Sequence, residues 1–191
     1  MNGKIILVNG ASSSGKSTLC RALQASAEEP FWHFSIDHFR NSGVLPTQRI
    51  ENGDFSWSEM RAAFFEGFHG CLPALAAAGN NLIVEHIIET NAWMRRLVRL
   101  LDSFDVFFVG LHCALSELER RELQRGDRRP GEARQDYSVV HTFCTYDIEI
   151  DTIQALEVNV NAVIKAWGSR TRPSAFDRMI TDERRAVQSA H

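Results

Sequence analysis

The stretch "LVNGASSSGKSTL", Leu7 to Leu19, decides the fold of this 191-residue chain. Within it, Gly10–Ser17 fits the pattern G-x-x-x-x-G-K-[ST] without a mismatch. The apolar run Lys4–Val8 before it is typical of a buried strand. The segment after it has the apolar spacing of a helix, at Leu19, Ala22, Leu23 and Ala27. Strand, small-residue loop and helix together predict a loop whose backbone N–H groups surround an anion at a helix N-terminus.

This phosphate loop, Gly10–Ser17, predicts contacts with a nucleoside triphosphate. Lys16 is expected to reach the β- and γ-phosphates, and the Ser17 hydroxyl to ligate Mg²⁺. We therefore expect ATP and Mg²⁺ as cofactors, although no motif distinguishes ATP from GTP. The alternative is a serine- and glycine-rich turn that matches the pattern by chance. The expected nucleotide contacts are Gly10, Ala11, Ser12, Ser13, Ser14, Gly15, Lys16, Ser17 and Thr18.

The composition suits one α/β domain with a sizeable core, since 44% of the residues are apolar. The net charge of −3 gives no overall attraction to nucleic acid or to an anionic membrane. No apolar run is long enough for a membrane span, and the first strand begins where a secretory signal would lie. We therefore expect a cytoplasmic protein, in which the scattered cysteines are reduced thiols without a metal site of their own: Cys20, Cys71, Cys113 and Cys144.

Further apolar runs alternate with helical segments along the chain. Strands are predicted at residues 31–37, 80–88, 104–113 and 146–152. This alternation predicts a five-stranded parallel sheet with helices on both faces, a three-layer α/β sandwich. We expect a single domain over residues 1–168 and a polar tail, 169–191, that forms one more loosely held helix. The long irregular segment His38–Ser56 is predicted to be a functional or mobile loop.

Ligands of parallel sheets bind beyond the carboxyl ends of the strands, so Gly10, Asp37, Glu85 and Cys113 are expected to ring the site. Glu85 follows an apolar strand and is predicted to be a second Mg²⁺ ligand; the alternative is a glutamate that only begins the next loop. Asp37 is predicted to be the general base that accepts the proton of an alcohol. Its alternatives are a helix cap or a ligand of Mg²⁺-bound water.

An arginine-rich segment at about residues 120–137 is the candidate for a small lid over the transferring phosphate. Arg125 and Arg128 flank the break at Gly126 and are predicted to be catalytic, because they can neutralise charge that develops in the transition state. Arg121 is predicted to contact the nucleotide. The alternative is a solvated helix face, on which glutamates balance the arginines at helical spacing.

These motifs together resemble a known family. The chain carries, in order, "ILVNGASSSGKST", "SID" at Ser35–Asp37, "VGLHC", "RELQRGDR", "VVH" at Val139–His141 and "YDIEIDT". In this it resembles the chloramphenicol phosphotransferase-like proteins, P-loop kinases that phosphorylate a hydroxyl of the antibiotic. The resemblance implies a kinase-type fold with strand order 2-3-1-4-5, a lid that contains "RGDR", and Asp37 as the base. It leaves open whether antibiotic resistance is the biological role of this chain.

Two departures limit what the resemblance implies about the acceptor. Glu85-His86 stands where the family enzyme has two acidic residues, and the segment His38–Ser56 does not match. The leading hypothesis is therefore an ATP-dependent kinase that moves the γ-phosphate to a hydroxyl of a small molecule. The alternatives are a kinase of a nucleotide, sugar, shikimate-like compound or nucleotide-sugar, and an NTP-dependent switch. The sequence leaves open whether the chain forms a homo-oligomer.

Overall fold

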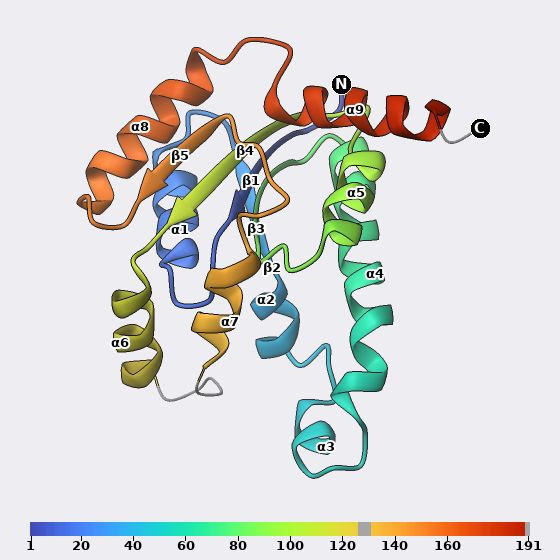
Figure 1. Cartoon of the computed structure of the whole chain (residues 1–191), viewed down its shortest axis with the longest axis vertical. Coiled ribbons are helices and arrows are strands. Elements are labelled where there is room, and N and C mark those ends of the chain that lie inside the picture. Colours follow the sequence, from blue (N-terminus) through green and yellow to red (C-terminus); the bar gives the residue numbers. More distant parts are fainter. Residues whose placement is uncertain (126–130, 190–191) are drawn as a thin grey trace.

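The computed structural model describes residues 1–125 and 131–189, except the side chains of Arg125, Ala186, Val187 and Ser189. Its strands form one parallel sheet in the order β2-β3-β1-β4-β5, as predicted (Figure 1). The strands are β1 (Lys4–Asn9), β2 (Phe31–Ser35), β3 (Asn81–His86), β4 (Asp105–His112) and β5 (Ile148–Asp151).

The central strand β1 aligns the carboxyl ends of its neighbours. Val8 lies opposite Glu85 of β3 and Val109 of β4, and Asn9 lies opposite His86 and Gly110. The chain leaves β1 directly into the phosphate loop. The register therefore brings the loop and the end of β3 to the same edge of the sheet.

Helices cover both faces of the sheet, which gives the three predicted layers (Figure 1). On one face, α1 (Lys16–Ser26) and α8 (Leu156–Gly168) pack on the strands through residues such as Leu23 and Val163. The other face carries α4 (Trp57–Ala77), α5 (Asn91–Leu100) and α9 (Ala175–Ser189). The remaining helices lie beyond the carboxyl ends of the strands: α2 (Ile36–Asn41), α3 (Thr47–Glu51), α6 (Leu115–Arg125) and α7 (Glu132–Val139).

The segment after β2 differs from the prediction. The strand ends at Ser35, so Asp37 lies in the first turn of α2 and not at the end of a strand. The Ser35 hydroxyl accepts a hydrogen bond from the backbone N–H of His38 at 3.2 Å and caps the helix. The segment expected to be irregular, His38–Ser56, therefore contains most of α2 and all of α3.

The C-terminal helix is held more firmly than predicted. Phe176 is 1% exposed and, with Ile180, belongs to the apolar core that α4 and α5 share with the sheet. Glu183 pairs with Arg95 and Arg99 of α5. Helix α9 is thus a packed part of this layer and not a loosely held one.

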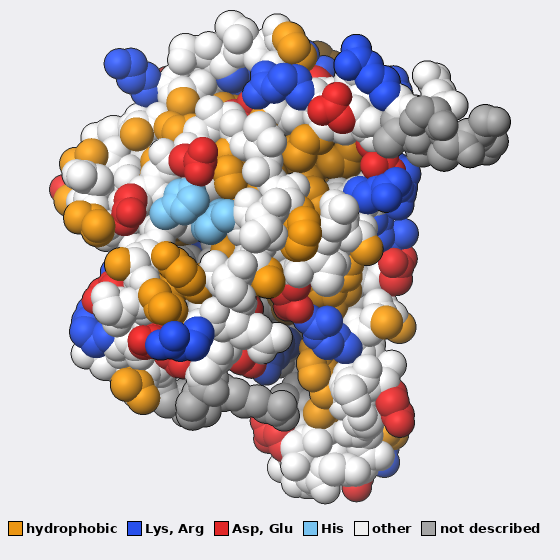
Figure 2. Space-filling model, in the orientation of Figure 1, with side chains coloured by type: hydrophobic (Ala, Val, Ile, Leu, Met, Phe, Trp, Pro, Cys, Tyr) orange, Lys and Arg blue, Asp and Glu red, His pale blue; other side chains and the backbone are white. Residues whose placement is uncertain are grey.

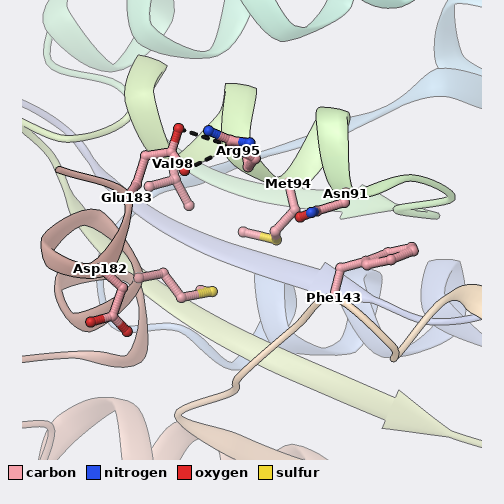
Figure 3. Close-up of a pocket in the computed structure, with 8 residues that line it drawn as sticks. Asn91, Met94, Arg95, Val98, Phe143, Asp182 and Glu183 are labelled. Carbon is pink, nitrogen blue, oxygen red and sulfur yellow. Dashed lines mark hydrogen bonds and ion pairs between the residues drawn. The ribbon is translucent and has the colours of Figure 1, made fainter. Parts of the chain in front are cut away.

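A cavity of about 300 Å³ lies at the seam between α5 and α9 (Figure 3). Met94 and Phe143 face it, and the ion pair of Arg95 with Glu183 lies along one wall. In Figure 1, α9 lies at the end of the sheet opposite α6 and α7. Within the described ranges, no helix has the length and apolarity needed to cross a membrane.

Candidate functional site

The phosphate loop has the backbone shape that its sequence predicts. Ser13 has φ 63° and Gly15 has φ 94°, both in the left-handed region that glycine adopts most easily. At Gly10, a Cβ atom would lie 2.7 Å from the carbonyl oxygen of Leu111 and 3.1 Å from Ser14 Oγ. The glycine at the first position is thus required by the closeness of β4, and the second by the turn into α1.

Asn9 fastens the start of the loop to its surroundings. Its fully buried amide donates hydrogen bonds to the carbonyl of Val140 at 2.7 Å and to Tyr146 Oη at 2.8 Å. Its carbonyl oxygen accepts from the backbone N–H of Ile88 at 2.9 Å. One side chain therefore joins the loop to the segments that follow β3 and α7. Sequence reasoning did not single out this residue.

Lys16 lies within the loop, where its ammonium donates to the carbonyl of Ala11 at 2.7 Å. Burial lowers the pKa of Lys16, and the nearby carboxylates of Glu85, Asp136 and Asp37 oppose this shift.

The hydroxyl oxygens of Ser13 and Ser14 are buried without a hydrogen-bond partner in the described part of the chain. A buried ammonium, unpartnered hydroxyls and a loop of left-handed residues at the start of a helix fit the oxygens of a phosphate chain.

Ser17 and Glu85 are brought together, as the sequence predicts. The Ser17 hydroxyl donates to Glu85 Oε1 at 3.1 Å, and His33 Nε2 lies 3.6 Å from the same oxygen. Burial alone would raise the pKa of Glu85, but His33, Lys16 and Ser17 outweigh it and hold the pKa at about 2. An ionised carboxylate beside a hydroxyl at the loop provides the hard oxygen ligands that suit Mg²⁺.

Asp37 lies at the same edge of the sheet, on α2. Its side chain is 34% exposed, and Arg40 Nη1 lies 3.9 Å from its Oδ1. The negative charge of Asp37 is among those that act to raise the pKa of Lys16, so the two residues lie near each other. The structure thus places this residue beside the loop, although on a helix turn and not on a strand end.

Helix α6 also contacts the loop. Arg121 Nη1 donates to the carbonyl of Ser14 at 3.3 Å, and its Nε donates to Glu117 at 2.6 Å. A cavity of about 290 Å³ opens here, lined by Cys113, Ala114, Glu117, Arg121, Thr152 and Ile153. Of the expected site residues, Cys113 and Arg121 therefore line one cavity next to the loop.

The two lid side chains predicted to be catalytic lie outside what the structure describes. Arg128 lies outside them, and so does the side chain of Arg125, the last residue of α6. The structure does describe how the residues on either side of this gap are joined. The buried carboxylate of Glu122 accepts hydrogen bonds from the backbone N–H groups of Gly131 at 2.9 Å and Ala133 at 2.8 Å, and so joins α6 to α7.

Sequence reasoning missed one acidic residue at the loop. The Asp136 carboxylate on α7 accepts a hydrogen bond from the backbone N–H of Ser12 at 2.9 Å. Burial raises the pKa of Asp136, while this hydrogen bond and Lys16 act in the opposite direction. The two residues are 124 positions apart, and only the helical pattern of the surrounding segment was visible in the sequence.

The residue after Glu85 points away from this site. His86 is buried on the other face of the sheet, where its Nε2 lies 2.8 Å from His69 Nε2 of α4. Phe65, Phe68 and Trp93 surround the two rings. The departure from the two acidic residues of the family enzyme is thus accommodated in the core.

The fold and the loop define a P-loop kinase architecture. The structure resembles the Mycobacterium tuberculosis APS kinase solved with AMPPNP and APS, with a TM-score of 0.68 and 20% identity over 88% of this chain and 99% of that one. It also resembles a sugar kinase from Janibacter, with a TM-score of 0.63 and 18% identity over 87% of this chain and 95% of that one. At such identities the likeness concerns the fold.

The family follows from the sequence comparisons. The model described as "Chloramphenicol phosphotransferase-like protein" matches residues 3–167, and the chain belongs to this family. A Mycobacterium tuberculosis protein of strain H37Rv, named as a candidate O-phosphotransferase, is 34% identical over 93% of this chain and 88% of its own length. The predicted resemblance and the predicted fold are therefore confirmed, and family and fold support a phosphotransferase.

Proposed function

We propose that the protein is an ATP-dependent kinase that transfers the γ-phosphate to a hydroxyl group of a small molecule. The observation that carries this proposal is the arrangement at the sheet edge, where Lys16 and Ser17 of the loop lie near the carboxylates of Glu85 and Asp37. The charge that Asp37 exerts on Lys16 supports a shared site. Family membership supports the reaction class.

The phosphate loop and α6 would hold the nucleotide. Backbone N–H groups of the loop and the Lys16 ammonium bind the phosphate oxygens, and the cavity between Arg121 and Thr152 takes the base. Ser17 and Glu85 would hold Mg²⁺, which supplies positive charge at the β- and γ-phosphates when it is bound. We propose Arg125 and Arg128 as the lid residues that neutralise the transferring group.

Asp37 would orient the acceptor and take its proton. A carboxylate within hydrogen-bond reach of the hydroxyl can aim the oxygen in line with the γ-phosphate and accept the proton as the new bond forms. Near it, an aromatic cluster joins α2 to α4, with ring centroids 6.1 Å apart for Phe39 and Phe64 and 5.3 Å apart for Trp57 and Phe64. We propose this cluster as a wall of the acceptor pocket.

The acceptor is the part of this proposal that an assay decides. The family name points to chloramphenicol, and similar folds include an APS kinase and a sugar kinase. We propose that the acceptor is a small hydroxylated molecule of the cytoplasm. We also propose that the protein has no nucleic-acid or membrane partner.

The first experiment measures ADP release from Mg·ATP with and without chloramphenicol, and then with small alcohols, sugars and nucleoside monophosphates. Strong stimulation by one compound identifies the acceptor. Tight ATP binding without stimulation by any alcohol would contradict the proposal and favour an NTP-dependent switch.

The role of Asp37 is tested by Asp37→Asn. Loss of a general base is expected to lower the transfer rate by about 10²–10⁴-fold, while ATP binds as before. Single-turnover transfer and ATP titration measure the two effects. Asp54→Asn is the matched control, because Asp54 is an exposed carboxylate of the neighbouring loop that pairs with Arg49. A nearly unchanged transfer rate in Asp37→Asn would show that another group accepts the proton.

A further inference from the structure

Three side chains with metal-binding atoms meet beneath the phosphate loop. Cys20 comes from α1, His33 from β2 and Glu85 from β3, and one ligand atom of each lies within 4.8 Å of the other two. Among the residues that the structure describes, this is the one group of three or more His, Cys, Asp or Glu side chains that could hold a metal ion. Cys20 lies one turn of α1 after Lys16, so the cluster adjoins the candidate site at the phosphate loop.

These groups are buried and incompletely partnered. Cys20 is 0% exposed, and the side chains of His33 and Glu85 are each 7% exposed. His33 Nε2 and Glu85 Oε2 lack a hydrogen-bond partner among the described residues. A buried polar atom without a partner costs free energy, so a ligand that satisfies both atoms would stabilise this arrangement.

We propose that Cys20, His33 and Glu85 form a binding site for a divalent transition-metal cation, with Zn²⁺ as the ion that fits best. Sulfur, imidazole nitrogen and carboxylate oxygen are the zinc ligand set, whereas Mg²⁺ takes oxygen ligands alone. In a tetrahedral zinc site, a nitrogen and an oxygen ligand lie about 3.4 Å apart. His33 Nε2 and Glu85 Oε1 are already 3.6 Å apart.

Charge balance favours a divalent ion in this buried place. Binding replaces the S–H bond of Cys20 with a sulfur–metal bond and releases the proton to solvent. The resulting thiolate and the Glu85 carboxylate carry two negative charges, which neutralise the ion. The complex therefore buries no net charge.

Occupation of this site would compete with the proposed Mg²⁺ ligand. Glu85 belongs to both arrangements, and its Oε1 accepts from Ser17. An ion drawn toward Cys20 and His33 would turn the carboxylate away from the nucleotide and slow phosphate transfer. This consequence rests on the proposed function, whereas binding of the ion does not.

The binding test uses Co²⁺, which reports thiolate ligation by a charge-transfer absorption band. We expect the full chain, without nucleotide, to bind one equivalent with this band, and Zn²⁺ to displace it. Cys20→Ala should lose the band, and the matched control Cys71→Ala, whose thiol lies on α4 outside the cluster, should keep it. Absence of the band in the native chain, or its persistence in Cys20→Ala, would overturn the proposal.

A second variant covers the case in which Cys20→Ala does not fold, which circular dichroism reveals. His33→Gln keeps Cys20 and is expected to weaken Zn²⁺ binding by at least about tenfold. Unchanged affinity in this variant would equally overturn the site.

The effect on turnover is measured separately. Zn²⁺ is expected to slow acceptor-stimulated ADP release at fixed Mg·ATP, and Cys20→Ala to require at least about tenfold more Zn²⁺ for the same inhibition. Equal inhibition of both proteins would contradict the competition. If no acceptor is found, the proposed function fails, and the cobalt spectrum still decides the metal site.

Discussion

Gly10 follows the strand that leads into the phosphate loop, and the space for a side chain there is already occupied. The carbonyl oxygen of Leu111 would lie 2.7 Å from an added Cβ. This oxygen belongs to β4, which is buried on both faces and cannot shift without disturbing its neighbours. The first glycine of the motif therefore sets how closely β1 and β4 approach at the edge of the site.

Gly10→Ala is expected to destabilise the chain by about 1–3 kcal/mol, since the added methyl group forces apart backbone that is tightly packed. Urea unfolding followed by circular dichroism measures this change. The control is Gly67→Ala in α4, where an added Cβ meets nothing within 4 Å. That substitution should raise stability by about 0.5–1 kcal/mol through helix propensity. If Gly10→Ala leaves the free energy of unfolding unchanged, β4 can shift to make room for the added methyl group.

At the scale of elements, α4 and β3 are joined by a buried pair of histidines. Burial, followed by Arg96, lowers the pKa of His69 to about 4, and burial, followed by His69, lowers that of His86 to about 3. In an unfolded chain both would titrate near 6.5. Between these values the unfolded chain binds protons that the folded chain does not, so the free energy of unfolding falls as the pH falls.

We expect the free energy of unfolding to fall by at least about 2 kcal/mol between pH 6.5 and pH 4. Replacing both rings in His69→Leu/His86→Leu, with apolar side chains of similar size, should make this dependence shallower. The double substitution should not abolish the pH dependence, because burial also lowers the pKa of His141 to about 4. Urea unfolding at several pH values provides the measurement.

Leu72→Ala serves as the comparison for the histidine pair. Leu72 is fully buried on α4 and does not titrate, so its truncation should cost about 2–5 kcal/mol at every pH without changing the slope. An unchanged slope in the double histidine variant would mean that other groups cause the acid sensitivity.

The elements that the sequence predicted well are those buried on both sides. The strands β1, β3 and β4 each contain an uninterrupted buried segment with an apolar run, and parallel strands covered by two layers have this composition. The predicted end of the second strand, at Asp37, was wrong because a serine cap begins a helix after Ser35. The cap depends on one residue, and the apolar residues before it make the segment look like a longer strand.

The site was predictable where a contiguous motif defines it. Gly10–Ser17 and the strand-end Glu85 could be placed because the loop and the parallel sheet fix their positions. Asp136, Asn9 and Glu122 were not predicted as structural partners of this region, because each bonds a backbone group brought near only by the fold. A single sequence holds no local signal for such pairs.

At the scale of the whole molecule, α9 closes the apolar layer formed by α4 and α5. Its polar composition suggested a loosely held tail, but Phe176 and Ile180 lie one helical turn apart and both face the core. Phe176 packs edge-on to Phe108 of β4, with ring centroids 5.6 Å apart. The chain beyond the family match at residue 167 thus contributes to the core.

Phe176→Ala is expected to lower the free energy of unfolding by about 3–5 kcal/mol, because it leaves a cavity against β4. Val158→Ala in α8, an exposed position, should change it by less than about 0.5 kcal/mol. Denaturant unfolding of the two variants tests whether α9 belongs to the cooperative unit. Equal stability of both variants would mean that the tail unfolds independently.

The central place of β1 has a consequence for how the chain is made. Residues 4–9 leave the ribosome well before residues 105–110, which are their partners on one side. Until those later residues emerge, this strand has apolar side chains and a backbone edge without their partners. Contacts so distant along the chain form slowly, and such surfaces favour aggregation. Yield during expression should therefore depend on chaperones and temperature more strongly than the stability of the finished protein does.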